Sequence, residues 1–205
     1  MHELLRQLIE NVHLTGDVRA DMRTFLVHHG QSKTVDHSIS VAEEAKRLAA
    51  MFGADETLAE IAGWLHDISA VFPPDKRNQI ARQLGVDVLP EEDTFPMIIH
   101  QKLSVVVARE IFEVSNKAAL SAISCHTTLK ANASMLDKVV FVADKIKWDG
   151  SGEPPYLDGI LAALEQSLDE ATFCYLDYLW QRRNTLRVVH PWLVEAYEQL
   201  LIVNN

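Results

Sequence analysis

Apolar residues recur at helical spacing along nearly the whole chain, and this periodicity constrains the fold more than any other feature. The clearest case is the segment 35–52, which Gly53 ends. Within it, Val41, Leu48 and Phe52 fall on one face of a helix. No stretch alternates apolar and polar residues convincingly, as a half-buried strand would. We therefore predict an all-α protein, built as a helical bundle.

Start and stop signals divide the rest of the chain into further helices. We expect looser chain from Asp87 to Pro96 and a connecting loop over 148–156, and Ser167 is a candidate break within the last long helix. Residues 1–33 are interpreted as an N-terminal helical extension of a domain that spans 34–205, and they would either cover that domain or form a dimer contact. The other predicted helices cover residues 2–13, 18–29, 55–69, 73–84, 98–112, 116–126, 134–147, 157–183 and the segment from Pro191 onward.

Composition excludes several classes of protein. A formal net charge of −10 argues against a protein that coats nucleic acid. No segment approaches the roughly 18 consecutive apolar residues of a membrane span, and the N-terminus lacks the apolar core of a signal peptide. Cys125 and Cys174 show no CxxC spacing, so free thiols in a reducing compartment are expected. We predict a cytoplasmic protein without nucleic-acid or membrane partners, and a homodimer stays open.

Several histidines and aspartates interrupt otherwise apolar helices, where an unpaired polar group is costly to bury. Each one alone is also explained as a hydrogen-bonded core residue or a helix cap. Five separate helices that each supply such a residue favour a shared metal site, because imidazole and carboxylate suit divalent transition metals. The other histidines lie in polar or terminal surroundings and are interpreted as structural or exposed. The candidate metal ligands are His37, His66, Asp67, His100, His126 and Asp144.

The order of these residues resembles that of the HD-domain metal-dependent phosphohydrolases. The resemblance rests on the strings EIAGWLHDIS, which holds His66-Asp67, and VVFVADKI, which holds Asp144, with His37 upstream. His100 and His126, in IIHQKL and AISCHTT, are similar to the histidines of the subgroup that binds two metals. Within that subgroup the chain most resembles the YqeK-like family of symmetrical bis(5′-nucleosyl)-tetraphosphatases, over about residues 34–177.

The resemblance implies an HD-domain fold and a dinuclear metal centre. One metal would be held by His37, His66, Asp67 and Asp144, and the second by His100 and His126, with Asp67 as the bridging ligand. His66 and Asp67 would be the catalytic residues. The metals would be iron, or manganese, cobalt or another divalent ion, and the reaction would be cleavage of diadenosine tetraphosphate into two ADP molecules.

The chain departs from the family at places that would face the substrate. Ala70 stands where many HD enzymes carry a lysine, and the loop after His126 reads TTLKANAS. In that loop Lys130 and Thr127 are candidate substrate-binding residues, although a solvated surface lysine is the alternative for Lys130. Hydrolysis of another nucleotide, such as a nucleoside monophosphate or an alarmone, therefore stays open. So does a non-catalytic regulatory module that binds a nucleotide.

Overall fold

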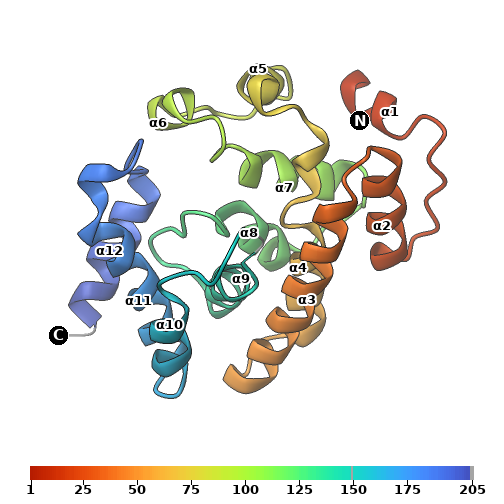
Figure 1. Ribbon diagram of the computed structural model, residues 1–205. Helices are drawn as coiled ribbons and strands as arrows, with labels where there is room; N and C mark the ends of the chain where they lie inside the picture. The colour runs from red at the N-terminus through yellow and green to blue at the C-terminus, as the bar shows by residue number, and fades with distance from the viewer. Residues whose placement is uncertain (149, 204–205) are drawn as a thin grey trace.

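The protein is described by a computed structural model over residues 1–148 and 150–203, and it consists of helices joined by turns and loops, with no strand among these residues (Figure 1). The all-α prediction is confirmed. Three short 3₁₀ segments supplement the α-helices: η1 (Ile68–Val71), η2 (Pro74–Lys76) and η3 (Arg183–Thr185). The α-helices are α1 (Glu3–Leu8), α2 (Val18–His28), α3 (Ser32–Phe52), α4 (Glu56–Leu65), α5 (Arg77–Gln83), α6 (Pro90–Thr94), α7 (His100–Glu110), α8 (Lys117–Cys125), α9 (Met135–Ile146), α10 (Leu157–Leu164), α11 (Leu168–Gln181) and α12 (Pro191–Val203).

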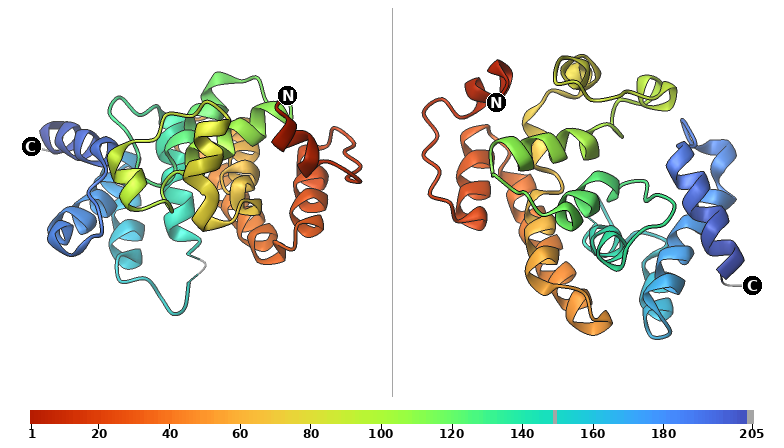
Figure 2. Two further views of the ribbon diagram at one scale, coloured as in Figure 1. Left: turned by 90° about the horizontal axis from the view of Figure 1, so that it is seen from above. Right: turned by 180° about the vertical axis from the view of Figure 1, so that it is seen from behind.

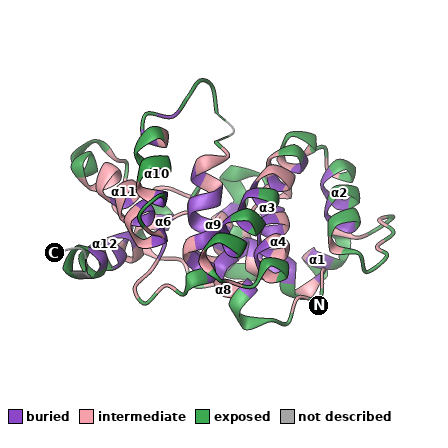
Figure 3. Ribbon diagram, turned by 90° about the horizontal axis from the view of Figure 1, so that it is seen from below, coloured by how far each residue is buried: buried purple, intermediate pink, exposed green. Residues whose placement is uncertain are grey.

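Helix α9 runs through the middle of the molecule. It packs against α3, α4 and α8 and, on its other side, against α10 and α11, so it is among the most buried helices (Figures 1 and 3). Val139, Phe141 and Val142 are fully buried, which explains the apolar run over 139–143. Because α9 is central, Asp144 near its end is delivered into the interior.

A glycine allows α3 and α4 to lie close together. A side chain at Gly63 of α4 would place its Cβ 2.5 Å from the Cα of Ala42 in α3. Two carbon atoms that are not bonded to each other cannot come this close. The close approach sets the distance between two histidines, because His37 lies on α3 and His66 directly follows α4.

The N-terminal segment covers the domain. Met22, Phe25 and Leu26 of α2 are fully buried and belong to the same hydrophobic core as the later helices. The ring of His29 lies with Nε2 2.8 Å from the carbonyl oxygen of Leu8, which ties α1 to the end of α2. Residues of α2 thus pack against the domain, and a dimer contact through the N-terminal segment stays a prediction. The two termini lie at opposite ends of the molecule (Figure 2).

Two helices end earlier than their apolar pattern predicts. The first was expected over 2–13 but ends at Leu8, and Asn11 takes a left-handed conformation with φ 65°. The helix expected over 55–69 ends at Leu65, and the chain continues through a turn into η1. Apolar residues continue at helical spacing beyond the ends of α1 and α4, because the residues that follow also pack against the core. The apolar pattern alone therefore does not show where each helix ends.

Two further outcomes concern short or interrupted helices: one helix was not expected, and the candidate break at Ser167 is confirmed. Residues expected to be loose contain α6, which starts at Pro90 and carries three acidic residues in its first turn; both features favour a helix start. The long helix expected over 157–183 is broken at Ser167. There the Ser167 hydroxyl accepts a hydrogen bond from the Glu170 N–H and caps α11.

Within the described residues, no helix combines the length and the apolar character that crossing a bilayer requires. Cys125 is buried and Cys174 partly buried, and both carry free thiols.

Candidate metal centre

The structure brings the six candidate ligands together from five parts of the chain. They line or underlie one hollow of about 320 Å³, which we call the central hollow; its walls also include Met97, Thr127, Lys145, Trp148, Tyr156 and Tyr175. His37 comes from the first turns of α3, and His66 and Asp67 from the end of α4. His100 begins α7, His126 follows α8, and Asp144 lies near the end of α9.

Asp67 stands between two pairs of histidines. Its Oδ1 lies 3.1 Å from His100 Nε2 and 3.5 Å from His126 Nε2. Its Oδ2 lies 3.6 Å from His66 Nε2 and 4.0 Å from His37 Nε2. One carboxylate therefore presents one oxygen to each pair, which is the arrangement of a bridging ligand.

The histidines within each pair are unusually close. The Nε2 atoms of His37 and His66 are 3.2 Å apart, and those of His100 and His126 are 2.8 Å apart. Asp144 completes the first pair, since its Oδ1 lies 3.2 Å from His37 Nε2 and 3.5 Å from His66 Nε2. Facing nitrogen lone pairs repel each other unless a proton or a metal ion lies between them.

Backbone carbonyl groups set the orientation of three of these rings. A carbonyl oxygen accepts only from a protonated Nδ1, so when the ring is neutral its lone pair is on Nε2 and is directed into the cluster. This is the neutral tautomer that binds metals. In each case the acceptor is the carbonyl three residues earlier: Gly63 for His66 at 2.8 Å, Met97 for His100, and Ile123 for His126 at 2.8 Å.

Burial and neighbouring charges shift the pKa values within the cluster in opposite directions. Burial, helped by the nearby rings of His100 and His66, lowers the pKa of His126 to about 4 despite the hydrogen bond with Asp67. Burial also opposes protonation of His66, but Asp67 and Asp144 prevail and raise its pKa to about 9. For both carboxylates burial is outweighed by histidine and lysine neighbours, so their pKa values lie well below the ordinary range. The cluster thus holds two anions and attracts positive charge.

Lys145 is a buried cation beside the cluster that sequence reasoning missed. Its Nζ donates to Asp144 Oδ2 at 2.5 Å and to the carbonyl oxygen of His126 at 3.1 Å. Burial would lower the pKa of Lys145, but Asp144 outweighs it and raises the pKa. The available signal was its position directly after Asp144, in a helix whose other residues there are buried.

Hydrogen bonds from neighbouring polar side chains hold together the parts of the chain that carry the candidate ligands. Ser69 Oγ donates to the carbonyl oxygen of His100 at 2.8 Å, and Ser104 Oγ donates to Ser69 Oγ at 2.9 Å. Gln101 Oε1 accepts from the Thr127 N–H at 3.1 Å. These bonds hold the start of α7 against the turn after Asp67 and the turn after His126.

The two predicted substrate-binding residues lie in different places. Thr127 lines the central hollow, with Oγ1 3.1 Å from His100 Nε2. Lys130 does not line it; its Nζ donates to Ser121 Oγ at 2.6 Å and lies 3.8 Å from Asp137 Oδ2. Tyr156 does line the hollow, and its buried hydroxyl has no hydrogen-bond partner among the described residues.

The residues present fit divalent metal ions. Two groups, His37–His66–Asp67 and Asp67–His100–His126, each offer ligand atoms that lie within 4.8 Å of one another. The donors are imidazole nitrogens and carboxylate oxygens, the set that suits divalent transition metals. Facing nitrogen lone pairs repel one another, and so do the two negatively charged carboxylates. Cations placed between these donor atoms relieve both repulsions.

Comparison with known proteins agrees with this geometry. The family model described as "HD domain" matches residues 34–149. The chain belongs to the HD domain family. Members of this family bind divalent metals, and this HD-domain protein is a hydrolase of the HD superfamily.

Similar proteins and a solved structure cover most of this HD-domain protein. It is 31% identical to the symmetrical bis(5′-nucleosyl)-tetraphosphatase of Halalkalibacterium halodurans over 81% of this chain and 88% of that protein. It is 47% identical to an uncharacterized protein of Lactococcus lactis subsp. cremoris over 69% of this chain and 72% of that one. A crystal structure of a predicted HD superfamily hydrolase involved in NAD metabolism from Clostridium acetobutylicum superposes with a TM-score of 0.81 at 25% identity, covering 93% of this chain and 98% of the other.

Proposed function

We propose that this HD-domain hydrolase cleaves a phosphoric anhydride bond of a nucleotide at a centre of two divalent metals. The proposed substrate is a dinucleoside tetraphosphate such as diadenosine tetraphosphate, which would be cut symmetrically into two ADP molecules. His37, His66, Asp67 and Asp144 would hold one metal, and Asp67, His100 and His126 the other. Iron is the proposed metal, with manganese or cobalt as substitutes.

The observation that carries the proposal is the position of the Asp67 carboxylate. Each of its oxygens faces a different pair of histidine nitrogens, at distances between 3.1 and 4.0 Å. A site for a single metal needs neither the second histidine pair nor the shared carboxylate. Metals bound at such a centre would polarise phosphoryl oxygens and lower the pKa of a bound water.

The protein's own groups would hold the ligands in their binding form and receive the phosphates. Carbonyl oxygens keep the Nδ1 proton on three histidines, so that Nε2 stays free to bind. Lys145 would neutralise the outer oxygen of Asp144 and would add positive charge to the wall of the central hollow. The Thr127 hydroxyl would donate a hydrogen bond to a phosphate oxygen. Lys130, which bonds Ser121 instead, is replaced by Lys145 as the proposed cation.

Product analysis tests the proposal. Purified protein loaded with Fe(II) or Mn(II) is incubated with diadenosine tetraphosphate, and the nucleotides are separated by ion-exchange chromatography. We expect ADP as the only product, and no product from Asp67→Ala. Asp93→Ala is the matched control, because Asp93 is an exposed carboxylate that pairs with Arg82.

The same experiment separates the alternatives. Formation of AMP and ATP would contradict symmetrical cleavage. Cleavage of a nucleoside monophosphate or an alarmone, but not of the dinucleotide, would keep the hydrolase and replace its substrate. Nucleotide binding without turnover of any of them would favour a regulatory module. Full activity in Asp67→Ala would overturn the role assigned to this carboxylate.

A further inference from the structure

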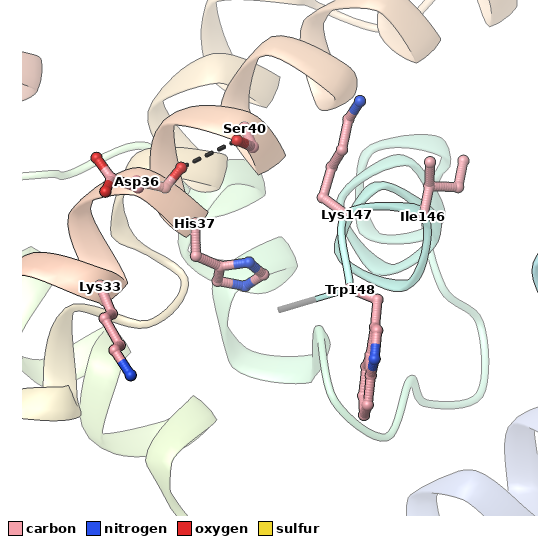
Figure 4. A pocket seen from close by; sticks show the side chains of 7 residues that line it. All are labelled: Lys33, Asp36, His37, Ser40, Ile146, Lys147 and Trp148. Atoms are coloured by element: carbon pink, nitrogen blue, oxygen red, sulfur yellow. Dashed lines mark hydrogen bonds between the residues drawn. The ribbon is translucent and has the colours of Figure 1, made fainter. Parts of the chain in front are cut away.

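A second hollow adjoins the central one. It has a volume of about 560 Å³ and lies between the start of α3 and the end of α9; its walls are Lys33, Asp36, His37, Ser40, Ile146, Lys147 and Trp148. We call it the α3–α9 hollow (Figure 4). His37 and Trp148 belong to the walls of both hollows. Both volumes lie within the roughly 300–1,000 Å³ typical of small-molecule sites.

Trp148 presents a large aromatic surface at this junction. Its side chain is half exposed, which is unusual for tryptophan. The indole lies against Gly150, where an added Cβ would come within 2.3 Å of Cζ2, so a larger residue at 150 would displace the ring. An exposed indole beside a phosphohydrolase site is suited to stacking of a nucleobase.

The cations of the α3–α9 hollow are placed unequally. Lys33 and Trp148 stand to the left and right of His37 and both extend downward in Figure 4, whereas Lys147 extends upward. The Nζ of Lys147 lies 3.4 Å from Glu44 Oε2. Lys33 is exposed and has no ion pair or hydrogen bond with the described residues. The carboxylate of Asp36 is turned away from His37 (Figure 4). Lys33 is therefore the cation available to an anion in this hollow.

The start of α3 has an unusual charge pattern. A lysine in the first turn opposes the helix dipole, and this turn contains no acidic residue and no side-chain cap. The free N–H groups and Lys33 together favour an anion beside His37. In a chain with a formal charge of −10, an unpaired lysine at a helix start beside the candidate metal ligands is suited to a phosphate.

From these features we infer that the α3–α9 hollow binds the second nucleoside of a dinucleoside polyphosphate. Its base stacks on Trp148 and its phosphate lies beside Lys33, while the first nucleotide occupies the central hollow. This inference rests on the proposed function and deepens it. A mononucleotide needs one hollow beside the metal ligands, whereas a substrate that is cut in its middle needs one on each side. The substrate class is therefore a phosphate chain with a nucleoside at both ends.

The test compares variants of Trp148 that keep or remove an aromatic ring. ADP is titrated into Mn(II)-loaded protein by calorimetry, and KM and kcat are measured with diadenosine tetraphosphate. We expect two ADP sites in the wild type and in Trp148→Phe, but one in Trp148→Leu. In Trp148→Leu we expect KM to rise roughly tenfold, within the range for a base stacked on an aromatic side chain, with kcat and metal content nearly unchanged.

Lysine variants test the phosphate contact in the same way. Lys33→Ala is expected to raise KM severalfold. Lys117→Ala is the control, because Lys117 is also an exposed lysine in the first turn of a helix. It lies at the opposite end of α8 from His126, so we expect KM to stay unchanged.

Each outcome separates this inference from the proposed function. If no dinucleotide is cleaved by the wild type, the proposed function fails, and the ADP titration still reports on the hollow by itself. A single ADP site in the wild type would overturn the inference, as would an unchanged KM in Trp148→Leu. Equal losses in Trp148→Phe and Trp148→Leu would assign Trp148 a structural role and would also overturn it.

Discussion

Two clusters of histidine and carboxylate within the described part of the chain differ in how their polar atoms are satisfied. The first is the candidate metal centre around Asp67. The second, which we call the Glu92 cluster, joins Glu92 of α6, Lys102 of α7 and His190, which precedes α12. Glu92 is fully buried; its Oε2 lies 2.8 Å from Lys102 Nζ, and its Oε1 lies 3.4 Å from His190 Nε2.

The histidines of the two clusters carry their proton on different ring nitrogens. In the Glu92 cluster, His190 Nδ1 accepts a hydrogen bond from the Trp192 N–H at 3.2 Å, so the proton lies on Nε2 and is directed at Glu92. At the candidate metal centre, Nδ1 of His66 donates to the carbonyl of Gly63, so it is Nε2 that faces Asp67 and is offered to a metal ion. The backbone group that contacts Nδ1 thus distinguishes the histidine of the Glu92 cluster from the candidate metal ligand.

The two clusters also differ in whether their charged groups have partners. Each oxygen of Glu92 has a partner, since the Leu89 N–H also donates to Oε2 at 2.8 Å, and one carboxylate is offset by one lysine. Around Asp67, four imidazole nitrogens and two carboxylates converge with Lys145 as the adjacent cation. The polar atoms of the Glu92 cluster are satisfied by one another, whereas the centre around Asp67 directs four imidazole rings and two carboxylates at one place, where cations would fit between them.

The sharpest test of this comparison replaces one histidine in each cluster by glutamine. Glutamine can donate a hydrogen bond as His190 does, but it lacks the imidazole lone pair that His66 offers. We expect His66→Gln to lower kcat/KM for diadenosine tetraphosphate by roughly 10³-fold or more, the scale of losing a group that stabilises transition-state charge. His190→Gln should stay within about threefold of the wild type. Similar losses in the two variants would remove the distinction between the clusters.

The second test concerns stability and uses Glu92→Ala. Removing Glu92 leaves Lys102 and His190 buried without their partner, so we expect the free energy of unfolding at pH 7 to fall by about 3 kcal/mol. Urea unfolding followed by circular dichroism measures the change. Metal content per chain should be unaffected, and loss of metal in Glu92→Ala would contradict a purely structural role.

The difference in free energy of unfolding between wild type and Glu92→Ala depends on pH through the pKa of Glu92. Burial alone would raise that pKa, but the bonds from His190, the Leu89 N–H and Lys102 outweigh it and lower the pKa below its ordinary 4.5. Because the folded protein favours the ionised carboxyl, the stabilisation is complete above pH 4.5 and is lost as pH falls through the lowered pKa. The gap between wild type and Glu92→Ala should therefore narrow in acid. A gap that widens would contradict this assignment.

The smallest expected effect is that of Tyr156→Phe. The Tyr156 hydroxyl is buried at the wall of the central hollow without a partner among the described residues, so its removal should leave the free energy of unfolding unchanged or slightly higher. If this hydroxyl donates to the substrate, KM should rise a fewfold while stability does not fall. Thermal unfolding and steady-state kinetics measured on the same preparation check both parts. A clear loss of stability would show that the hydroxyl is satisfied in the folded protein.

Helical periodicity predicted the fold class and most of the helices, because nearly every helix buries one apolar stripe. It failed at ends that depend on local backbone conformation, such as the turn at Asn11 with φ 65°, and at the five-residue helix α6. A helix of five residues is too short to show a period, so its starting proline and acidic residues were the better signal.

For the candidate site, the sequence predicted which residues converge but not how they are held. Polar residues in apolar helices identified the histidines and aspartates, since each would be costly to bury alone. The acceptors of the Nδ1 protons are backbone carbonyls, which no residue type reveals. Lys130 was predicted as the cation because of its place after His126, but the path of that loop, which tertiary packing sets, directs it to Ser121.

The central claim is that Asp67 bridges two metals, and a count of metal ions tests it most directly. Wild type, Asp67→Ala and Glu92→Ala are loaded with Mn(II), freed of excess ion by gel filtration and analysed by inductively coupled plasma mass spectrometry. We expect about two ions per chain in the wild type and in Glu92→Ala, and fewer than one in Asp67→Ala. Two ions retained in Asp67→Ala, or none in the wild type, would contradict the account.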